Sequence, residues 1–127
     1  MIKTNMKKLM LFLIIMLSLY AQASAETQKW HAKDIVGYKL TLIDKKTIES
    51  FTFWADQNLV SASIGTVGGP ITAVLWYWKI DKNGILLIKD DDNKIWYRMK
   101  KLYEKKGRIG VELSGNKVEY EKKEVKK

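Results

Sequence analysis

The ten residues from Ile71 to Ile80, ITAVLWYWKI, constrain the fold more than any other part of the chain. They include no turn-forming residue and are rich in the β-branched and aromatic types that suit a pleated strand. Both faces of such a strand would be apolar, with Ile71, Ala73, Leu75 and Tyr77 on one and Val74, Trp76, Trp78 and Ile80 on the other. We therefore expect a strand that is covered on both sides or faces an occupied cavity. Which face is interior stays open.

From residue 35 onward, short runs with apolar residues at alternate positions are separated by turn signals about every 8–12 residues, a spacing typical of β-sandwiches and barrels. The runs predict eight strands, near residues 38–42, 47–54, 60–64, 71–80, 85–89, 94–102, 108–113 and 117–121. The links are too short for parallel crossovers, so neighbouring strands should be antiparallel. The predicted fold class is all-β: a single antiparallel up-and-down meander that closes into a roughly eight-stranded barrel and so removes its exposed edges.

The segments before and after the predicted strands also have recognisable features. Residues 26–33 are polar apart from Trp30, so they form either a short lead-in or a helical turn whose indole plugs one end of the fold. The tail, residues 122–127, is strongly charged and is expected to fray. A barrel of eight strands is just wide enough either to fill with side chains or to hold one small ligand.

The first 25 residues have the features of a cleavable signal peptide. Three lysines precede an apolar run at residues 9–19, and a small-residue cleavage site follows, with the cut after Ala25 or after Ala23. The alternative is an uncleaved membrane anchor, but the apolar run is short for a span. The chain has no cysteine, which excludes a lipoprotein leader and disulfides. We expect a periplasmic or secreted protein, with residues 26–127 forming one β-barrel domain and no membrane span once the leader is removed.

The mature chain is basic. Removing the leader takes three of the 23 basic residues and none of the 14 acids, which leaves a net charge of +6. Seven basic residues fall between positions 94 and 108, and those proposed to contact an acidic protein partner are Lys100, Lys101, Lys105 and Lys106. Nucleic acid is a poor partner for an exported protein. The alternative is a solvated strand edge that lysines protect from aggregation.

Three segments carry a resemblance to a known class of proteins. They are residues 34–38 (DIVGY), residues 78–88 (WKIDKNGILLI) and the closing ladder at residues 115–120 (GNKVEY). With these segments the mature chain resembles the small, secreted, lipocalin-like β-barrel proteins of bacteria. The resemblance implies the same barrel fold, and no binding residue is carried over from it.

All five tryptophans lie after the leader, and Trp76 and Trp78 project to one face of a single strand. An indole combines a broad apolar surface with one hydrogen-bond donor. The pattern therefore fits three roles: filling the core, lining a ligand pocket, or forming an aromatic patch for a protein partner. The residues proposed to line a pocket are Trp54, Trp76, Trp78 and Tyr97.

The sequence contains no convincing catalytic, cofactor or metal motif. The loop at residues 65–70 is rich in glycine but lacks the Lys-Ser/Thr pair of a phosphate-binding loop. The Asp90–Asn93 turn lacks the ligand spacing of a calcium loop, and one histidine without cysteine makes zinc or copper sites unexpected. Glu49 and Glu112 lie in mid-strand, where they either point into a cavity or belong to polar outer faces.

These observations favour an exported, non-enzymatic protein without a cofactor or metal. In the first hypothesis its barrel holds a small apolar or amphiphilic ligand. In the second it is a periplasmic inhibitor or immunity-type protein that binds an acidic partner through a basic face. An enzyme is the third class, and it would need a catalytic group that the sequence does not reveal.

Overall fold

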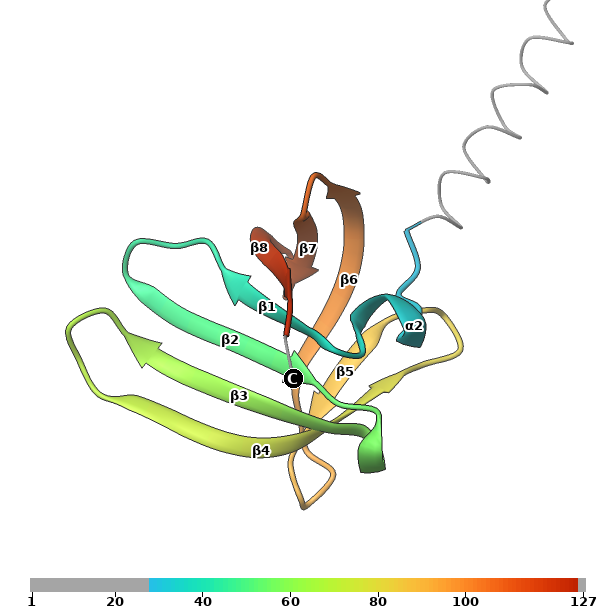
Figure 1. Cartoon of the computed structure of the whole chain (residues 1–127), viewed down its shortest axis with the longest axis horizontal. Helices are drawn as coiled ribbons and strands as arrows, with labels where there is room; N and C mark the ends of the chain where they lie inside the picture. The colour runs from blue at the N-terminus through green and yellow to red at the C-terminus, as the bar shows by residue number, and fades with distance from the viewer. Residues whose placement is uncertain (1–27, 126–127) are drawn as a thin grey trace, which may run out of the picture.

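Residues 28–125, which the computed structural model describes, form a closed barrel of eight antiparallel strands in sequence order (Figure 1). The predicted fold class is confirmed. The strands are β1 (Tyr38–Leu42), β2 (Thr47–Phe53), β3 (Leu59–Thr66), β4 (Ile71–Ile80), β5 (Leu86–Lys89), β6 (Ile95–Lys105), β7 (Arg108–Leu113) and β8 (Asn116–Glu124). A single helical turn, α2 (Ala32–Ile35), precedes them, and a 3-10 turn, η1 (Asp56–Asn58), joins β2 to β3. The expected signal peptide lies outside the described residues.

Pairing between the first and last strands closes the barrel. Tyr38 lies opposite Glu124, and Leu42 lies opposite Tyr120. The expectation that the chain frays from residue 122 is therefore wrong for Lys122–Glu124. These charged residues are held because β8 supplies the hydrogen-bonding partner that β1 would otherwise lack on that side.

Trp30 plugs one end of the barrel, here called the α2 end. Its side chain is only 2% exposed, and its indole Nε1 donates a 2.9 Å hydrogen bond to the carbonyl oxygen of Met99. Its backbone N–H donates to the carbonyl of Gly84 in the β4–β5 turn. The alternative of a plugging indole is thus confirmed, and α2 adds the buried side chain of Ile35 beside it.

The interior face of β4 is the one that carries the tryptophans. Trp78 is buried in the core, and Val74, Trp76 and Ile80 pack against it. On the outer face, Ile71 and Leu75 are each 55% exposed. The expectation that β4 is covered on both sides is therefore wrong within residues 28–125, because the wall of this barrel is a single sheet and Ile71, Leu75 and Tyr77 on its outer face remain exposed.

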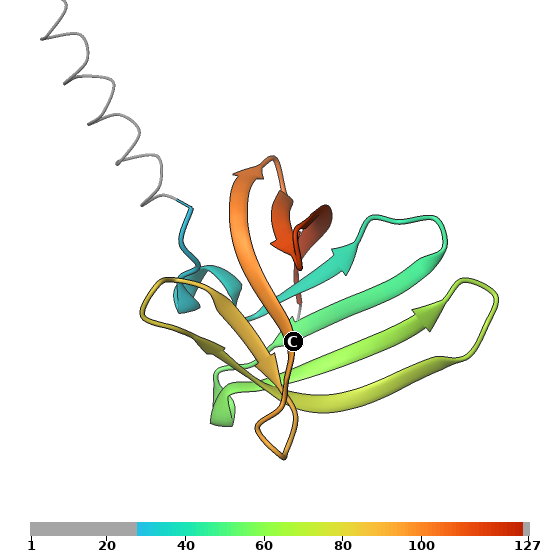
Figure 2. The ribbon, with the colours of Figure 1, turned by 180° about the vertical axis from the view of Figure 1, so that it is seen from behind.

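β4 is much longer than its neighbour β5. Only Tyr77–Ile80 pair with β5, while the preceding part of β4 pairs with β3 alone. Figures 1 and 2 show this first part of β4 at the margin of the sheet. Beyond the end of β5, stacked indoles bridge β4 and β6: the rings of Trp76 and Trp96 lie 5.5 Å apart at an interplanar angle of 7°.

The part of the chain that the structure describes contains no helix of the length and apolarity needed to cross a membrane.

Candidate binding site at the open end of the barrel

Glu49 on β2 is a carboxylate that shares the interior face of its strand with two phenylalanines. Side chains alternate along a strand, so Glu49, Phe51 and Phe53 point the same way. Both phenylalanines are fully buried in the core. Glu49 lies near the β1–β2 turn, where it is partly exposed, and only Thr47 is nearer to that turn on the same face of β2. The strand therefore carries one ionisable group to the end of the barrel opposite α2, here called the open end.

Two tyrosines from distant parts of the chain meet this carboxylate. The hydroxyl of Tyr97 on β6 donates a 3.3 Å hydrogen bond to Glu49 Oε1, and the hydroxyl of Tyr120 on β8 donates a 3.1 Å hydrogen bond to Oε2. The ring of Phe51 supports both, with centroids 5.0 Å from Tyr97 and 6.2 Å from Tyr120. Three strands thus position one carboxylate from two sides.

The environment keeps both tyrosines protonated. Burial is the main cause that raises the pKa of Tyr97 to about 12, and the charge and hydrogen bond of Glu49 raise it further. The same causes raise the pKa of Tyr120. Since a phenol can donate only while it is protonated, both hydroxyls remain donors to Glu49 throughout the neutral range.

Glu49 lines a pocket of about 510 Å³ between the β1–β2 and β7–β8 turns. Its walls are the apolar side chains of Leu42, Leu113 and Val118, all of which pack against the core. Its rim is polar and carries Asp44, Thr47, Asn116, Lys117 and Glu119. Sites for small molecules commonly measure about 300–1,000 Å³ and combine apolar walls with a few polar groups. This pocket has that size, and it combines apolar with polar lining residues, of which six of the ten are polar or charged.

The four aromatic residues proposed from the sequence do not line one pocket. Trp78 lies in the core and donates a 2.9 Å hydrogen bond to the carbonyl oxygen of Trp54. The indole of Trp54 itself donates to Ser61 Oγ at 3.1 Å, and Ser61 belongs to the outer face of β3. Tyr97 reaches the pocket through its hydrogen bond to Glu49, whereas Trp76 is partly buried against Trp96 and does not line the pocket.

The exposed indole of Trp96 is held on both faces. One face stacks on Trp76, and Lys94 Nζ lies 4.1 Å from the ring centroid. Its Nε1 donates a 2.8 Å hydrogen bond to Asp90 Oδ2. Since neighbouring side chains occupy its faces, Trp96 acts as a closure between β4 and β6 and offers little stacking surface to a ligand.

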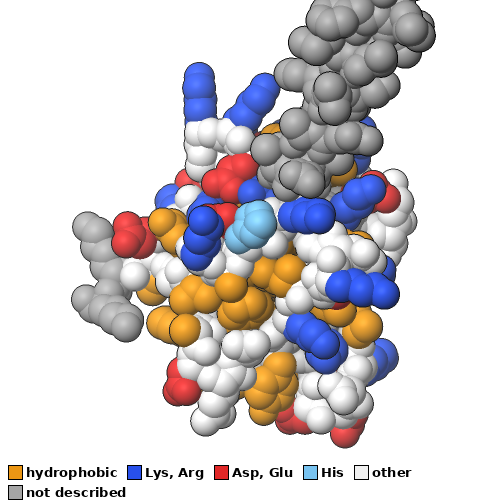
Figure 3. Space-filling model, turned by 90° about the vertical axis from the view of Figure 1, so that its right-hand side faces the viewer, with side chains coloured by type: hydrophobic (Ala, Val, Ile, Leu, Met, Phe, Trp, Pro, Cys, Tyr) orange, Lys and Arg blue, Asp and Glu red, His pale blue; other side chains and the backbone are white. Residues whose placement is uncertain are grey.

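The four lysines proposed to meet a partner separate into two environments. Lys101 is only 6% exposed; its Nζ lies 2.8 Å from Glu104 Oε1 and 5.6 Å from the centroid of the Trp30 ring. Lys100 is exposed on the same strand. Lys105 and Lys106 line a groove of about 730 Å³ with Tyr103, Arg108 and Glu119. Figure 3 shows basic side chains spread across the face near α2, with hydrophobic side chains between them.

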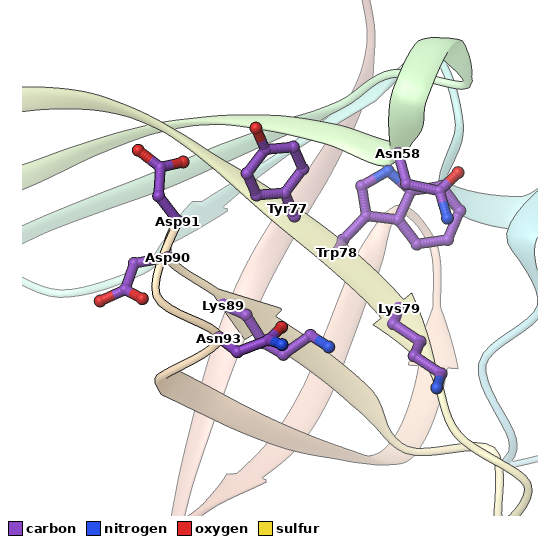
Figure 4. A pocket seen from close by; sticks show the side chains of 8 residues that line it. All are labelled: Asn58, Tyr77, Trp78, Lys79, Lys89, Asp90, Asp91 and Asn93. Carbon is purple, nitrogen blue, oxygen red and sulfur yellow. The ribbon is translucent and has the colours of Figure 1, made fainter.

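A groove of about 690 Å³ lies on the outside of the barrel, where β4 crosses the β5–β6 turn (Figure 4). Tyr77, Lys79 and Lys89 approach it from the strands, and Asp90 and Asp91 come from the turn. Asp90 is engaged within its own turn, because its Oδ1 accepts hydrogen bonds from the backbone N–H groups of Asp92 and Lys94. Within residues 28–125, no three His, Asp or Glu side chains gather where they could hold a metal ion.

Sequence reasoning therefore missed Tyr120 and left the orientation of Glu49 open. The sequence did contain an indication for Glu49, because it lies two and four positions before Phe51 and Phe53 and so shares their face of the strand. Once those phenylalanines are assigned to the core, this spacing predicts an interior carboxylate. Glu112, the other mid-strand glutamate, lies between the core residues Val111 and Leu113 and so faces outward. The meeting of Glu49 with Tyr97 and Tyr120 depends on strand register, which the sequence does not display.

No protein-family profile, curated protein or solved structure matches this chain. The closed barrel of eight antiparallel strands agrees with the fold implied by the lipocalin-like resemblance.

Proposed function

We propose that this protein is an exported, non-enzymatic binding protein that holds a small amphiphilic molecule at the open end of its barrel. The observation that carries the proposal is the position of Glu49, a carboxylate that two tyrosine hydroxyls orient and that lines a pocket with both apolar and polar residues. The leader-like first 25 residues support export.

The chemistry of this site favours a particular polar group on the ligand. A carboxylate can accept about four hydrogen bonds, and Tyr97 and Tyr120 supply two. The remaining acceptor positions suit a hydrogen-bond donor or a cation, while Leu42, Leu113 and Val118 suit an apolar chain or ring. An anionic head group would meet the charge of Glu49 and bind less well.

Competition between three amphiphiles tests this proposal. Dodecylamine, dodecanol and dodecanoate share one chain length and differ only in the head group. Each would compete with the fluorescent probe N-phenyl-1-naphthylamine for the purified protein. We expect dodecylamine to displace the probe most readily and dodecanoate least readily, because only the amine offers both a charge and donors to Glu49.

The chain provides a matched pair of variants for this assay. Glu49→Gln removes the interior charge with little change of shape, and Glu112→Gln makes the same change on the outer face of β7. We expect Glu49→Gln to reduce the preference for the amine over the carboxylate, and Glu112→Gln to leave it unchanged. Failure of all three amphiphiles to displace the probe, or equal behaviour of the two variants, would contradict the proposal.

A second candidate function is protein binding through the groove of the β6–β7 hairpin. Lys105, Lys106 and Arg108 line this groove together, which favours an acidic partner. Such a complex would weaken as salt rises, and reversing the charges of Lys105 and Lys106 would slow its association. If neither higher salt nor the charge reversals change the association rate, this groove is not the contact surface.

A further inference from the structure

β4 has a strand edge that no other described strand covers. Within residues 28–125, Ile71–Trp76 pair with β3 on one side and with no strand on the other, because β5 reaches only as far as Tyr77. The stacked ring of Trp96 lies beside Trp76 and obstructs that end. The accessible edge therefore runs from Ile71 to Leu75. Alternate residues along it direct backbone N–H and C=O groups away from β3.

The side chains along this edge carry no charge and are apolar except for Thr72. Ile71 and Leu75 are the prominent exposed residues of the outer face, and Val67 in the preceding turn is 60% exposed. Residues 67–78 include no Asp, Glu, Lys or Arg, although 29% of the whole chain is charged. Native proteins usually protect such edges with lysine, proline or a covering element. Pro70 precedes this edge, but no lysine lies on it.

The charge of the protein indicates which binding partner the exposed edge of β4 favours. The chain has a formal net charge of +9, or +6 without its first 25 residues, so two copies repel each other wherever their lysines would meet. A neutral edge is where two such copies can approach closely. A partner selected for the basic surface would instead dock where the lysines are. The neutral, apolar edge therefore favours a second copy of this chain over an acidic partner.

The residues of the edge are also complementary to themselves. A two-fold axis through Ala73 would pair two copies of β4 in antiparallel register, with Ala73 opposite its own copy. Ile71 of each copy would then lie opposite Leu75 of the other. Two such pairs of branched apolar side chains would flank the central pair of Ala73 residues. We propose that two copies of this protein associate through antiparallel pairing of Ile71–Leu75 on β4, which joins the two sheets into one.

The proposed dimer is independent of the ligand site, because Glu49 and its pocket lie on β2 and at the β1–β2 and β7–β8 turns. Edge pairing would bring Ile71 and Leu75 of the two copies into lateral contact, although the outer face of β4 would still face solvent. Pairing along a strand edge needs no pocket, since main-chain hydrogen bonds supply affinity and the cross-strand side chains supply register.

Sedimentation equilibrium of the protein, expressed with its own leader and purified in the form that the host accumulates, tests the proposal. We expect a reversible dimer. Leu75→Lys places a charged side chain opposite the apolar Ile71 of the other copy, which removes an apolar cross-strand pair and should weaken dimerisation by about tenfold or more. Ile43→Lys is the matched control, because Ile43 is also an exposed apolar residue but lies on the β1–β2 turn. This control should dimerise as the parent protein does.

A paired substitution tests the register. Ile71→Glu alone should also weaken the dimer, whereas the double variant Ile71→Glu/Leu75→Lys should recover it, because each glutamate would then face a lysine of the other copy. A monomer at all accessible concentrations, a dimer that Leu75→Lys leaves unchanged, or a double variant no better than the single ones would overturn the proposal. The proposal would also be overturned if the purified protein carried a different, extended peptide paired with this edge in place of a second copy.

Discussion

The hydroxyl of Tyr120 donates a 3.1 Å hydrogen bond to Glu49 Oε2, although 71 positions separate the two residues in the chain. The contact joins the last strand to the second across the interior of the barrel. A carboxylate in this position would be costly without partners, and Tyr97 and Tyr120 supply them. Because Glu49 also lines the pocket, its remaining acceptor positions face that pocket.

Alkaline titration tests this polar cluster. In the folded protein, the pKa of Tyr97 is raised from 10.0 to about 12, chiefly by burial and further by Glu49. A raised pKa means that folding favours the protonated phenol. The stability gained is fully present below the unfolded pKa and is lost as the pH rises toward the folded value. We expect Tyr97 and Tyr120 to resist ionisation, as measured by tyrosinate absorbance, until the protein unfolds.

Glu49→Gln should shift this titration to lower pH, because it removes the charge that opposes tyrosinate formation. Burial remains, so the shift should be partial. Glu112→Gln should leave the titration unchanged, because its side chain faces outward. If the Glu49→Gln and parent curves coincide, the hydrogen bonds to Tyr97 and Tyr120 do not form in solution.

Stability should depend on the plug at the α2 end. Trp30→Ala leaves a cavity beneath α2 and should lower the free energy of unfolding by about 3–5 kcal/mol. Trp30→Phe keeps most of the volume but leaves the Met99 carbonyl without its indole donor, which should cost about 1–3 kcal/mol. Urea denaturation measures both changes.

The partly exposed Trp96 serves as the control for this series. Truncating it to alanine should cost only about 1 kcal/mol, which is the scale of one stacked aromatic pair. A Trp30→Ala variant that is no less stable than Trp96→Ala would show that the plug contributes little.

Tyr103 and Gly110 should show strong energetic coupling. They are close neighbours on paired strands, and a Cβ atom added to Gly110 would collide with the ring of Tyr103. Gly110→Ala should therefore destabilise the protein by about 1–3 kcal/mol through displacement of that ring, whose hydroxyl donates to Glu119. In a Tyr103→Ala background the same change should be nearly neutral. Additive effects in the double-mutant cycle would rule out the collision.

The acid limb of the stability curve should depend on Glu104. Partial burial works against its ionisation, but the hydrogen bond and charge of Lys101, together with Lys122, outweigh burial and lower the pKa of Glu104. A lowered pKa stabilises the folded state above the unfolded value of 4.5, and this stabilisation is lost as the pH falls through the folded value. Glu104→Gln should flatten the dependence of unfolding free energy on pH below about 5.

Glu104→Gln should also lower stability at neutral pH, because it leaves the charge of the buried Lys101 without its carboxylate partner. Glu121→Gln is the control, since Glu121 pairs with Lys123 at the surface. Equal pH profiles for the two variants would contradict a structural role for the Lys101–Glu104 pair.

The strands were predictable because alternation and turn signals are local properties of the chain. The Asn83-Gly84 turn and the alternation around Ile109 and Val111 suffice to place their strands. The interior face of β4 was not predictable, because both of its faces are apolar. Only closure of the barrel separates buried Trp78 from exposed Leu75.

The candidate site was predictable only in part. Tyr97 was expected near a ligand, and Glu49 was recognised as a mid-strand carboxylate. Their contact requires the register of β2, β6 and β8, which is a long-range property. Trp54 was placed in the pocket because it is aromatic, whereas its parity opposite to Phe53 puts it outside the barrel beside Ser61.

Native mass spectrometry of the protein purified gently from the exported fraction shows whether the barrel carries a small molecule. We expect a small added mass on each chain that disappears on denaturation and is depleted in Glu49→Gln. The released molecule should carry an amine or another hydrogen-bond donor on an apolar body. A chain that carries no added mass, or one accompanied only by a stoichiometric protein partner, would contradict the claim that the barrel holds a small amphiphile.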